Sequence, residues 1–271
     1  MAEFLFNGKK VYYEIYGSGG KPIVILNGIM MSTASWQPFV EQFSKNNQLI
    51  LVDFFDQGQS ERLSFDYNHD LQVDLLDELI QRLWYTDVTL MGISYGGEIA
   101  LQYALKHPTR VNRLILANTC ARTSSWLKKI GDGWNAVAAT GDGLAYYLTT
   151  IPIIYSTEFF HKKADWMQSR EEMLTKYFSH PDVLQALIRL TNSSVGYDVT
   201  DQLHNVKCPT LIISGSEDAL VPPTEQQLLH QLIPNSVYVT INGSGHASMY
   251  ENPLAFASLV LGFTNAQEVT I

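Results

Sequence analysis

The sequence is poor in several features that would indicate particular classes of protein. Its two cysteines, Cys120 and Cys208, are too few for a disulfide framework and lack the spacing of a metal site. Lysine and arginine form no cluster, and the net charge of −9 argues against a nucleic-acid partner. No apolar segment approaches the length of a membrane span, and the N-terminal residues lack the pattern of a signal peptide. We therefore expect a cytoplasmic, reduced protein without a membrane span.

Signatures of cofactor binding are also missing. The chain has no G-x-G-x-x-G dinucleotide motif, and its histidines and carboxylates form no group with ligand spacing. We expect no metal and no cofactor, and a small molecule as the partner. The 271 residues, 46% of them hydrophobic, suffice for one α/β domain with an insertion, whereas the oligomeric state is not indicated.

Short apolar runs alternate with amphipathic segments along most of the chain. The runs that predict strands cover residues 11–16, 22–26, 48–53, 88–93, 113–117, 210–214 and 236–241. The segments with helical periodicity cover residues 36–43, 71–83, 97–106, 225–232 and 254–263. Parallel strands require such crossover helices. The predicted fold class is α/β, with a mostly parallel central sheet and helices on both faces.

Residues 122–200 interrupt this alternation, because they contain no apolar strand and are rich in aromatic and helix-forming residues. We interpret them as a helical lid inserted between two strands, with residues 1–121 and 201–271 forming the two parts of the core. A lid presents apolar side chains to the site that it closes. We therefore expect Trp126 of the lid, together with Met30 and Met249 of the core, in a substrate pocket.

The segment Gly92-Ile93-Ser94-Tyr95-Gly96 matches the pattern G-x-S-x-G. It follows an apolar strand and precedes an amphipathic helix, which is the context that this motif requires. A serine at such a sharp turn adopts a strained backbone conformation, and side chains two residues away on either side would collide with it. Ser94 is therefore the predicted nucleophile.

A serine nucleophile needs a base and a group that orients the base. His246 lies among small residues between the last predicted strand and the last helix, where an imidazole can reach across the sheet. Asp218 follows the strand before it, so it is expected at the same edge of the sheet. We predict a Ser94–His246–Asp218 triad, and the chain order Ser, Asp, His differs from the orders in the two main protease folds.

The oxyanion of an acyl-transfer intermediate requires two N–H donors. The N–H of Tyr95, at the start of the helix after Ser94, is one candidate, since helix N-termini favour negative charge. The loop after the strand at residues 22–26 supplies the other, with the N–H of Ile29 as donor and Asn27 and Gly28 in support.

Four motifs together resemble the α/β-hydrolase superfamily over nearly the whole chain. They are Asn27-Gly28 with Trp36 downstream, residues 53–60, the turn at residues 92–97, and Gly215 through Asp218 with Gly245-His246. The chain is most similar to the compact, lidded group of small esterases, thioesterases, lactonases and C–C bond hydrolases. This family usually has histidine where Asn27 stands, and we expect Asn27 to replace its hydrogen bonds.

The resemblance and the triad predict a serine hydrolase that cleaves a small to medium, largely apolar ester or thioester. Two alternatives use the same triad, namely a lactonase and a C–C bond hydrolase. A further alternative uses the fold without hydrolysis, as a small-molecule receptor or as a cofactor-free lyase or oxygenase. Sequence alone does not distinguish the substrates.

Overall fold

A computed structural model of the chain describes residues 1–267, and its centre is a sheet of eight strands. The strands lie in the order β1-β2-β4-β3-β5-β6-β7-β8. From β4 to β8 all neighbours are parallel, whereas β1 and β2 add an antiparallel edge. Their bounds are β1 Ala2–Phe6, β2 Lys9–Tyr16, β3 Lys21–Leu26, β4 Asn47–Val52, β5 Val88–Ile93, β6 Val111–Ala117, β7 Thr210–Gly215 and β8 Ser236–Ile241.

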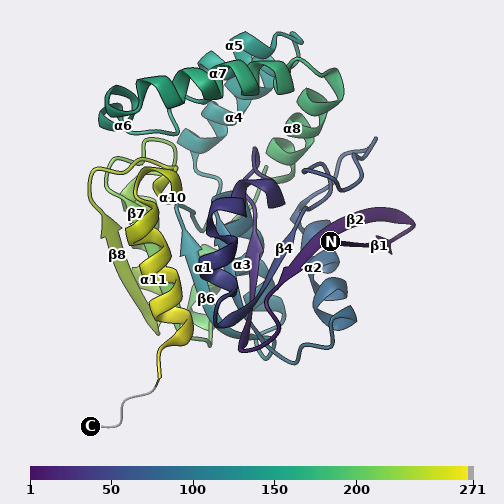
Figure 1. The fold of residues 1–271 in the computed structure, drawn as a ribbon, viewed down its shortest axis with the longest axis vertical. Coiled ribbons are helices and arrows are strands. Elements are labelled where there is room, and N and C mark those ends of the chain that lie inside the picture. The colour runs from purple at the N-terminus through teal and green to yellow at the C-terminus, as the bar shows by residue number, and fades with distance from the viewer. Residues whose placement is uncertain (268–271) are drawn as a thin grey trace.

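Helices cover both faces of the sheet (Figure 1), which confirms the predicted α/β class. One face packs against α1 (Val40–Ser44) and α11 (Pro253–Asn265), and the other against α2 (His69–Arg82), α3 (Tyr95–Lys106) and α9 (Pro223–Leu232). Side chains alternate between the faces of a strand, so a strand covered on both sides is apolar throughout. In β3, Ile23 and Ile25 join one core cluster, whereas Val24 and Leu26 join the other.

Two elements differ from the prediction. β1 was not expected, because its pattern is half-exposed and it pairs only with β2 at the edge of the sheet. The segment predicted as one helix at residues 36–43 is a 3₁₀-helix, η1 (Thr33–Phe39), followed by the short α1. Pro38 lies inside η1 and lacks the N–H that a continuous α-helix would use, which explains the tighter turn.

Between β6 and β7 the chain forms five helices that stand above the carboxyl ends of the strands (Figure 1). We call residues 125–193 the insertion. Its helices are α4 Ser125–Ala138, α5 Gly143–Thr150, α6 Thr157–Lys162, α7 Ala164–Phe178 and α8 Pro181–Ser193. A buried ion pair joins it to the core, because the Arg189 guanidinium of α8 donates to both oxygens of Asp56 at 2.6 and 3.0 Å. Asp56 lies in the loop after β4, and its position fixes one end of the insertion.

Within residues 1–267, no helix has both the length and the apolar character needed to cross a membrane.

Candidate active site

Ser94 lies at the turn between β5 and α3, with φ +53° and ψ −123°. A non-glycine residue in this region is strained, which requires support from the surroundings. The two flanking glycines provide the space. A Cβ atom on Gly92 would lie 2.2 Å from the carbonyl oxygen of Gly96, and one on Gly96 would lie 2.2 Å from that of Leu26. The G-x-S-x-G pattern is therefore a steric requirement of this turn.

The structure brings the three predicted triad residues into one hydrogen-bonded row. His246 Nε2 lies 2.9 Å from Ser94 Oγ, and His246 Nδ1 lies 2.9 Å from Asp218 Oδ2. They come from the loops after β5, β7 and β8, whose carboxyl ends meet at the same edge of the sheet. His246 and Asp218 are buried, while Ser94 remains partly accessible. This geometry allows His246 to take a proton from Ser94 and Asp218 to hold the ring in place.

Asp218 is surrounded by hydrogen-bond donors. Its Oδ1 accepts from the backbone N–H groups of Leu220 and Val221 at 3.1 and 2.8 Å. Its Oδ2 accepts from the side-chain amides of Asn118 and Gln226 at 3.0 and 3.1 Å. A buried carboxylate needs such compensation, because burial without hydrogen bonds would disfavour its charged form.

Asn118 and Gln226 were not predicted from the sequence. Asn118 directly follows β6, at the same sheet edge as the triad, and has φ +47°, which asparagine tolerates better than most residues. Its Oδ1 accepts from Ser248 Oγ at 2.6 Å, which fixes the amide so that Nδ2 points to Asp218. An asparagine at the end of a parallel strand was the signal that could have identified it.

A second carboxylate holds the loop that carries His246. Glu251 accepts from the N–H of Gly245 at 3.0 Å and from Ser156 Oγ of the insertion at 2.6 Å. Burial raises the pKa of Glu251, although these hydrogen bonds oppose the rise. The histidine loop is thus tied to the insertion, so the position of the base depends on both parts of the chain.

The loop after β3 lies beside Ser94, as the oxyanion prediction requires. A Cβ atom added to Gly28 would lie 3.5 Å from Ser94 Cβ, so the two backbones are close. Within the described residues, the N–H of Ile29 donates to no protein acceptor, and that of Tyr95 begins α3, where no helical partner exists. Both donors are therefore available, and their role in oxyanion binding remains a prediction.

Asn27 anchors this loop by four side-chain hydrogen bonds, two of which are at 2.8 Å. Its Nδ2 donates to the carbonyl of Val52 at 2.8 Å, and its Oδ1 accepts from Trp36 Nε1 at 2.8 Å. The side chain is 1% exposed, and its hydrogen-bond partners do not include Ser94, His246 or Asp218. Asn27 thus supports the loop, in the position where the family usually has histidine.

A pocket opens over Ser94 between the strand ends and the insertion. Its lining includes Met30 and Met249, as expected, together with Trp134 of α4. Trp126 does not line this pocket, because it is 52% exposed and donates from Nε1 to the carbonyl of Ala219. Helical periodicity explains the difference, since the face of α4 that meets the pocket carries Leu127, Ile130, Gly131 and Trp134.

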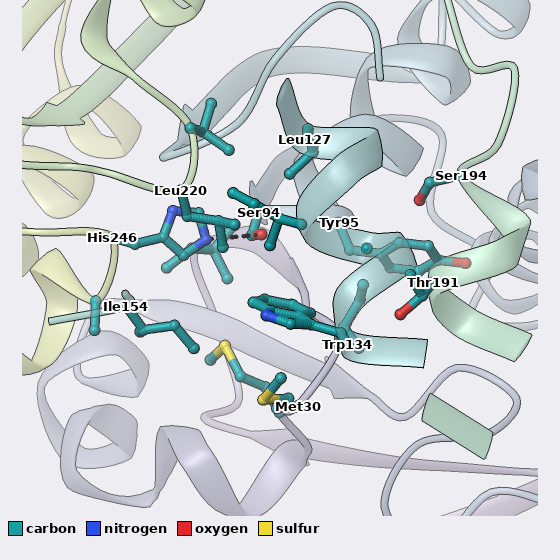
Figure 2. A pocket seen from close by; sticks show the side chains of 18 of the residues that line it. Met30, Ser94, Tyr95, Leu127, Trp134, Ile154, Thr191, Ser194, Leu220 and His246 are labelled. Carbon is teal, nitrogen blue, oxygen red and sulfur yellow. Dashed lines mark hydrogen bonds between the residues drawn. The ribbon is translucent and has the colours of Figure 1, made fainter. Parts of the chain in front are cut away.

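Figure 2 shows how this pocket is arranged. The Ser94–His246 pair lies on one side of the Trp134 ring, and the Met30 side chain approaches that ring from below. The oxygens of Thr191 and Ser194 lie beside the Tyr95 ring, away from His246. The reacting groups therefore adjoin an apolar space that has a polar end.

Arg170 of α7 is the arginine that lines the pocket, and its guanidinium lies against aromatic rings. Its guanidinium carbon lies 4.9 Å from the centre of the Trp166 ring and 5.3 Å from that of Tyr250. Within residues 1–267 no carboxylate lies within 4 Å of it, and its Nε is buried without a partner. By contrast, each of the other arginines donates to a carboxylate or a backbone carbonyl, namely Arg62, Arg82, Arg110, Arg113, Arg122 and Arg189.

In the part of the chain that the structure describes, no group of three or more His, Cys, Asp or Glu side chains is placed to hold a metal ion.

Comparison with known proteins shows the family. The family model described as "alpha/beta hydrolase fold" matches residues 21–253, and the chain belongs to this family. It is a hydrolase. The chain is similar to the 3-oxoadipate enol-lactonase 1 of Acinetobacter baylyi, with 27% identity over 96% of this chain and 94% of that protein.

Two solved structures of hydrolases are also similar to this chain. MGS-M2, an α/β hydrolase enzyme from a Medee basin deep-sea metagenome library, is 50% identical with a TM-score of 0.98, over 100% of this chain and 99% of that chain. A thermophilic esterase from Thermogutta terrifontis is 25% identical with a TM-score of 0.82, over 94% of this chain and 93% of that chain.

Proposed function

We propose that the protein is a serine hydrolase that cleaves a small to medium, largely apolar ester or thioester. The observation that carries this proposal is the row Ser94–His246–Asp218, held together by 2.9 Å contacts at the floor of an apolar pocket. An activated serine in a partly closed apolar site is suited to attack on an acyl carbonyl.

In the first step, His246 Nε2 takes the proton of Ser94 as its Oγ attacks the carbonyl carbon of the substrate. The N–H groups of Ile29 and Tyr95 bind the negative oxygen of the tetrahedral intermediate. The imidazolium then gives its proton to the leaving alcohol or thiol, and the acyl group remains on Ser94. Asp218 stabilises the imidazolium throughout.

In the second step, water replaces the alcohol. His246 takes a proton from the water as it attacks the acyl carbonyl, and returns that proton to Ser94 Oγ when the acid leaves. The enzyme is restored, and the products are one acid and one alcohol or thiol.

The insertion is proposed to act as a lid, which is the role that the sequence predicts for residues 122–200. Trp134 and Leu127 of α4 and Ile154 lie around the reacting pair in the pocket (Figure 2). An apolar cover excludes water and strengthens the hydrogen bonds of the site. The core of residues 1–121 and 201–271 would then supply the chemistry, while the lid selects the substrate. A cytoplasmic location is also proposed, because Cys120 and Cys208 are buried and unpaired.

The alternatives share much of this machinery. A lactonase or C–C hydrolase would use the same triad, whereas a receptor, lyase or oxygenase would not need acylation of Ser94. We expect hydrolysis of p-nitrophenyl esters from acetate to octanoate, with kcat/KM highest at an intermediate chain length because the pocket is closed above by the insertion. Binding of these esters without any release of p-nitrophenol would instead favour a receptor.

Arg170 leads to a prediction about charge. A guanidinium without a carboxylate partner in an apolar pocket favours an anion, and a hydrogen bond to a charged group contributes about 1.5–3 kcal/mol. We expect Arg170→Met to lower the ratio of kcat/KM for the p-nitrophenyl monoester of adipic acid to that for p-nitrophenyl hexanoate by about tenfold or more. The control is Lys163→Met, which removes a cation from the exposed surface of the insertion. An unchanged ratio in Arg170→Met would show that the guanidinium serves packing alone.

A further inference from the structure

Glu98 is a buried carboxyl group on the lining of the catalytic pocket, and the mechanism above does not use it. It lies on α3, and its N–H donates to the carbonyl of Ser94 at 3.2 Å. Residues four apart on a helix share a face, with Cβ atoms about 5–6 Å apart. Glu98 therefore lies in the first turn of the helix that follows the nucleophile, and both residues line the same pocket.

A chain of hydrogen bonds leads to this carboxyl. Gln102 Nε2 lies 2.7 Å from His69 Nδ1, and because the amide nitrogen is a donor, Nδ1 accepts and Nε2 carries the hydrogen. His69 Nε2 then donates to Ser194 Oγ at 3.0 Å, and Ser194 Oγ donates to Glu98 Oε2 at 3.1 Å. When the carboxyl group is ionised, every bond in this chain runs toward Glu98.

Within the described residues, no cation lies beside Glu98 to balance a charge. The titratable groups that face it are His69 from α2, Cys120 from the loop after β6, Tyr197 from the loop after α8, and Tyr95 on its own helix. Burial lowers the pKa of His69 to about 3, and it raises the pKa values of the thiol and of both phenols. All four neighbours are therefore neutral at pH 7.

Burial among neutral groups favours the protonated acid. Desolvation raises the pKa of Glu98 to about 8, despite the donors Ser194 and Cys120. Ser194 Oγ, 3.1 Å from Oε2, is a hydroxyl that can accept the proton of the acid as well as donate to the carboxylate. When it accepts from protonated Glu98, the hydrogen of Ser194 itself is free to bind an acceptor atom that enters the pocket.

We propose that Glu98, with Ser194, forms a specificity subsite that donates a hydrogen bond to an uncharged oxygen, such as a ketone, in the acyl group of the substrate. The polar end of the pocket, where Ser194 and Thr191 lie beside Tyr95, provides the surroundings that such an oxygen needs (Figure 2). Thr191 Oγ1 is buried without a partner and adds a second polar atom at this end. The inference rests on the proposed ester hydrolysis.

The test compares two esters of nearly the same size and shape, one of which has a ketone oxygen in its acyl group. In p-nitrophenyl 4-oxopentanoate a ketone oxygen replaces one methyl group of p-nitrophenyl 4-methylpentanoate. The ratio of their kcat/KM values measures the preference for the oxygen. At pH 7 we expect the natural protein to prefer the oxo ester by about tenfold, as one net hydrogen bond predicts. The preference should fall toward one as the pH rises through about 8, because ionised Glu98 cannot donate.

Two variants separate hydrogen bonding from packing. Glu98→Gln keeps an N–H donor, so it should keep the preference and lose its dependence on pH. Glu98→Leu should reduce the ratio to about one at every pH. The matched control is Glu14→Gln, which neutralises an equally buried glutamate on β2 that lies outside the pocket. It should leave both the ratio and its pH dependence unchanged.

The outcomes distinguish this inference from the proposed function. If the natural protein hydrolyses both esters at equal rates, or if Glu98→Gln retains the fall of the ratio with pH, the Glu98 subsite is refuted while ester hydrolysis stands. If the natural protein hydrolyses neither ester, the proposed function fails first. The pH profile of Glu98→Gln remains decisive even if Glu98→Leu does not fold.

Discussion

Replacing Ser94 with alanine is expected to lower kcat for p-nitrophenyl esters on the order of 10⁴-fold or more, because the reaction then has no nucleophile. The melting temperature should change little. The hydroxyl of Ser94 forms one hydrogen bond, with His246, in a site that is accessible to solvent. A fluorophosphonate probe should label the natural protein and not the variant.

Two further variants sharpen this prediction. Ser94→Gly should be equally inactive yet more stable than Ser94→Ala by about 1–3 kcal/mol, because glycine relieves the strain at φ +53°. Thermal unfolding measures this difference. Ser169→Ala removes a hydroxyl from the exposed face of α7 and serves as the control. Undiminished turnover or labelling in Ser94→Ala would overturn the mechanism.

Replacing Asp218 with asparagine is expected to lower kcat by about 10³–10⁴-fold. Oδ1 of Asp218 accepts two backbone N–H groups, so the oxygen of the new amide must occupy that place. The NH₂ group then takes the position of Oδ2, 2.9 Å from His246 Nδ1, and donates to it. His246 Nε2 would therefore carry a hydrogen and could no longer accept the proton of Ser94.

The neighbouring carboxylate provides the control for this variant. Glu217→Gln should retain activity, because His246 Nδ1 donates to the carboxylate of Asp218 and not to that of Glu217. Steady-state kinetics with p-nitrophenyl butyrate measures both. His246→Ala should reduce kcat about as much as Ser94→Ala, since members of a triad act as a unit. Loss of activity in Glu217→Gln together with an active Asp218→Asn would identify Glu217 as the orienting acid.

The turn at Ser94 could be predicted from the sequence, because the residues that cause it are its neighbours in the chain. The space beside Ser94 demands glycine at positions 92 and 96, so the pattern itself predicts a strand followed by a sharp turn and a helix. The buried parallel strands were equally readable, because two covered faces require continuous apolar runs such as residues 88–93. The edge strand β1 lacks this signal, since one of its sides has no partner.

The choice between tryptophans illustrates what the sequence could not supply. Trp126 and Trp134 lie in the same helix and have the same chemistry, and only the rotation of α4 over the sheet decides that Trp134 meets the pocket. The ion pair between Arg189 and Asp56 helps to set the placement of the insertion, and it joins residues 133 positions apart. Such contacts leave no periodicity that a reader of the chain could detect.

The sequence by itself determined the fold class and the alternation of strands and helices in the core, because these follow from hydrophobic pattern, and it predicted three triad residues from the steric demands of one turn and from the loops after two later strands. The tertiary structure decided the surroundings of those residues. It placed Asn118 and Gln226 around Asp218, and within residues 1–267 it left Glu98 without a cation beside it. The pKa and the protonation state of an ionisable group depend on which residues are packed against it. Many of these residues are distant in the sequence, so only the folded chain decides them.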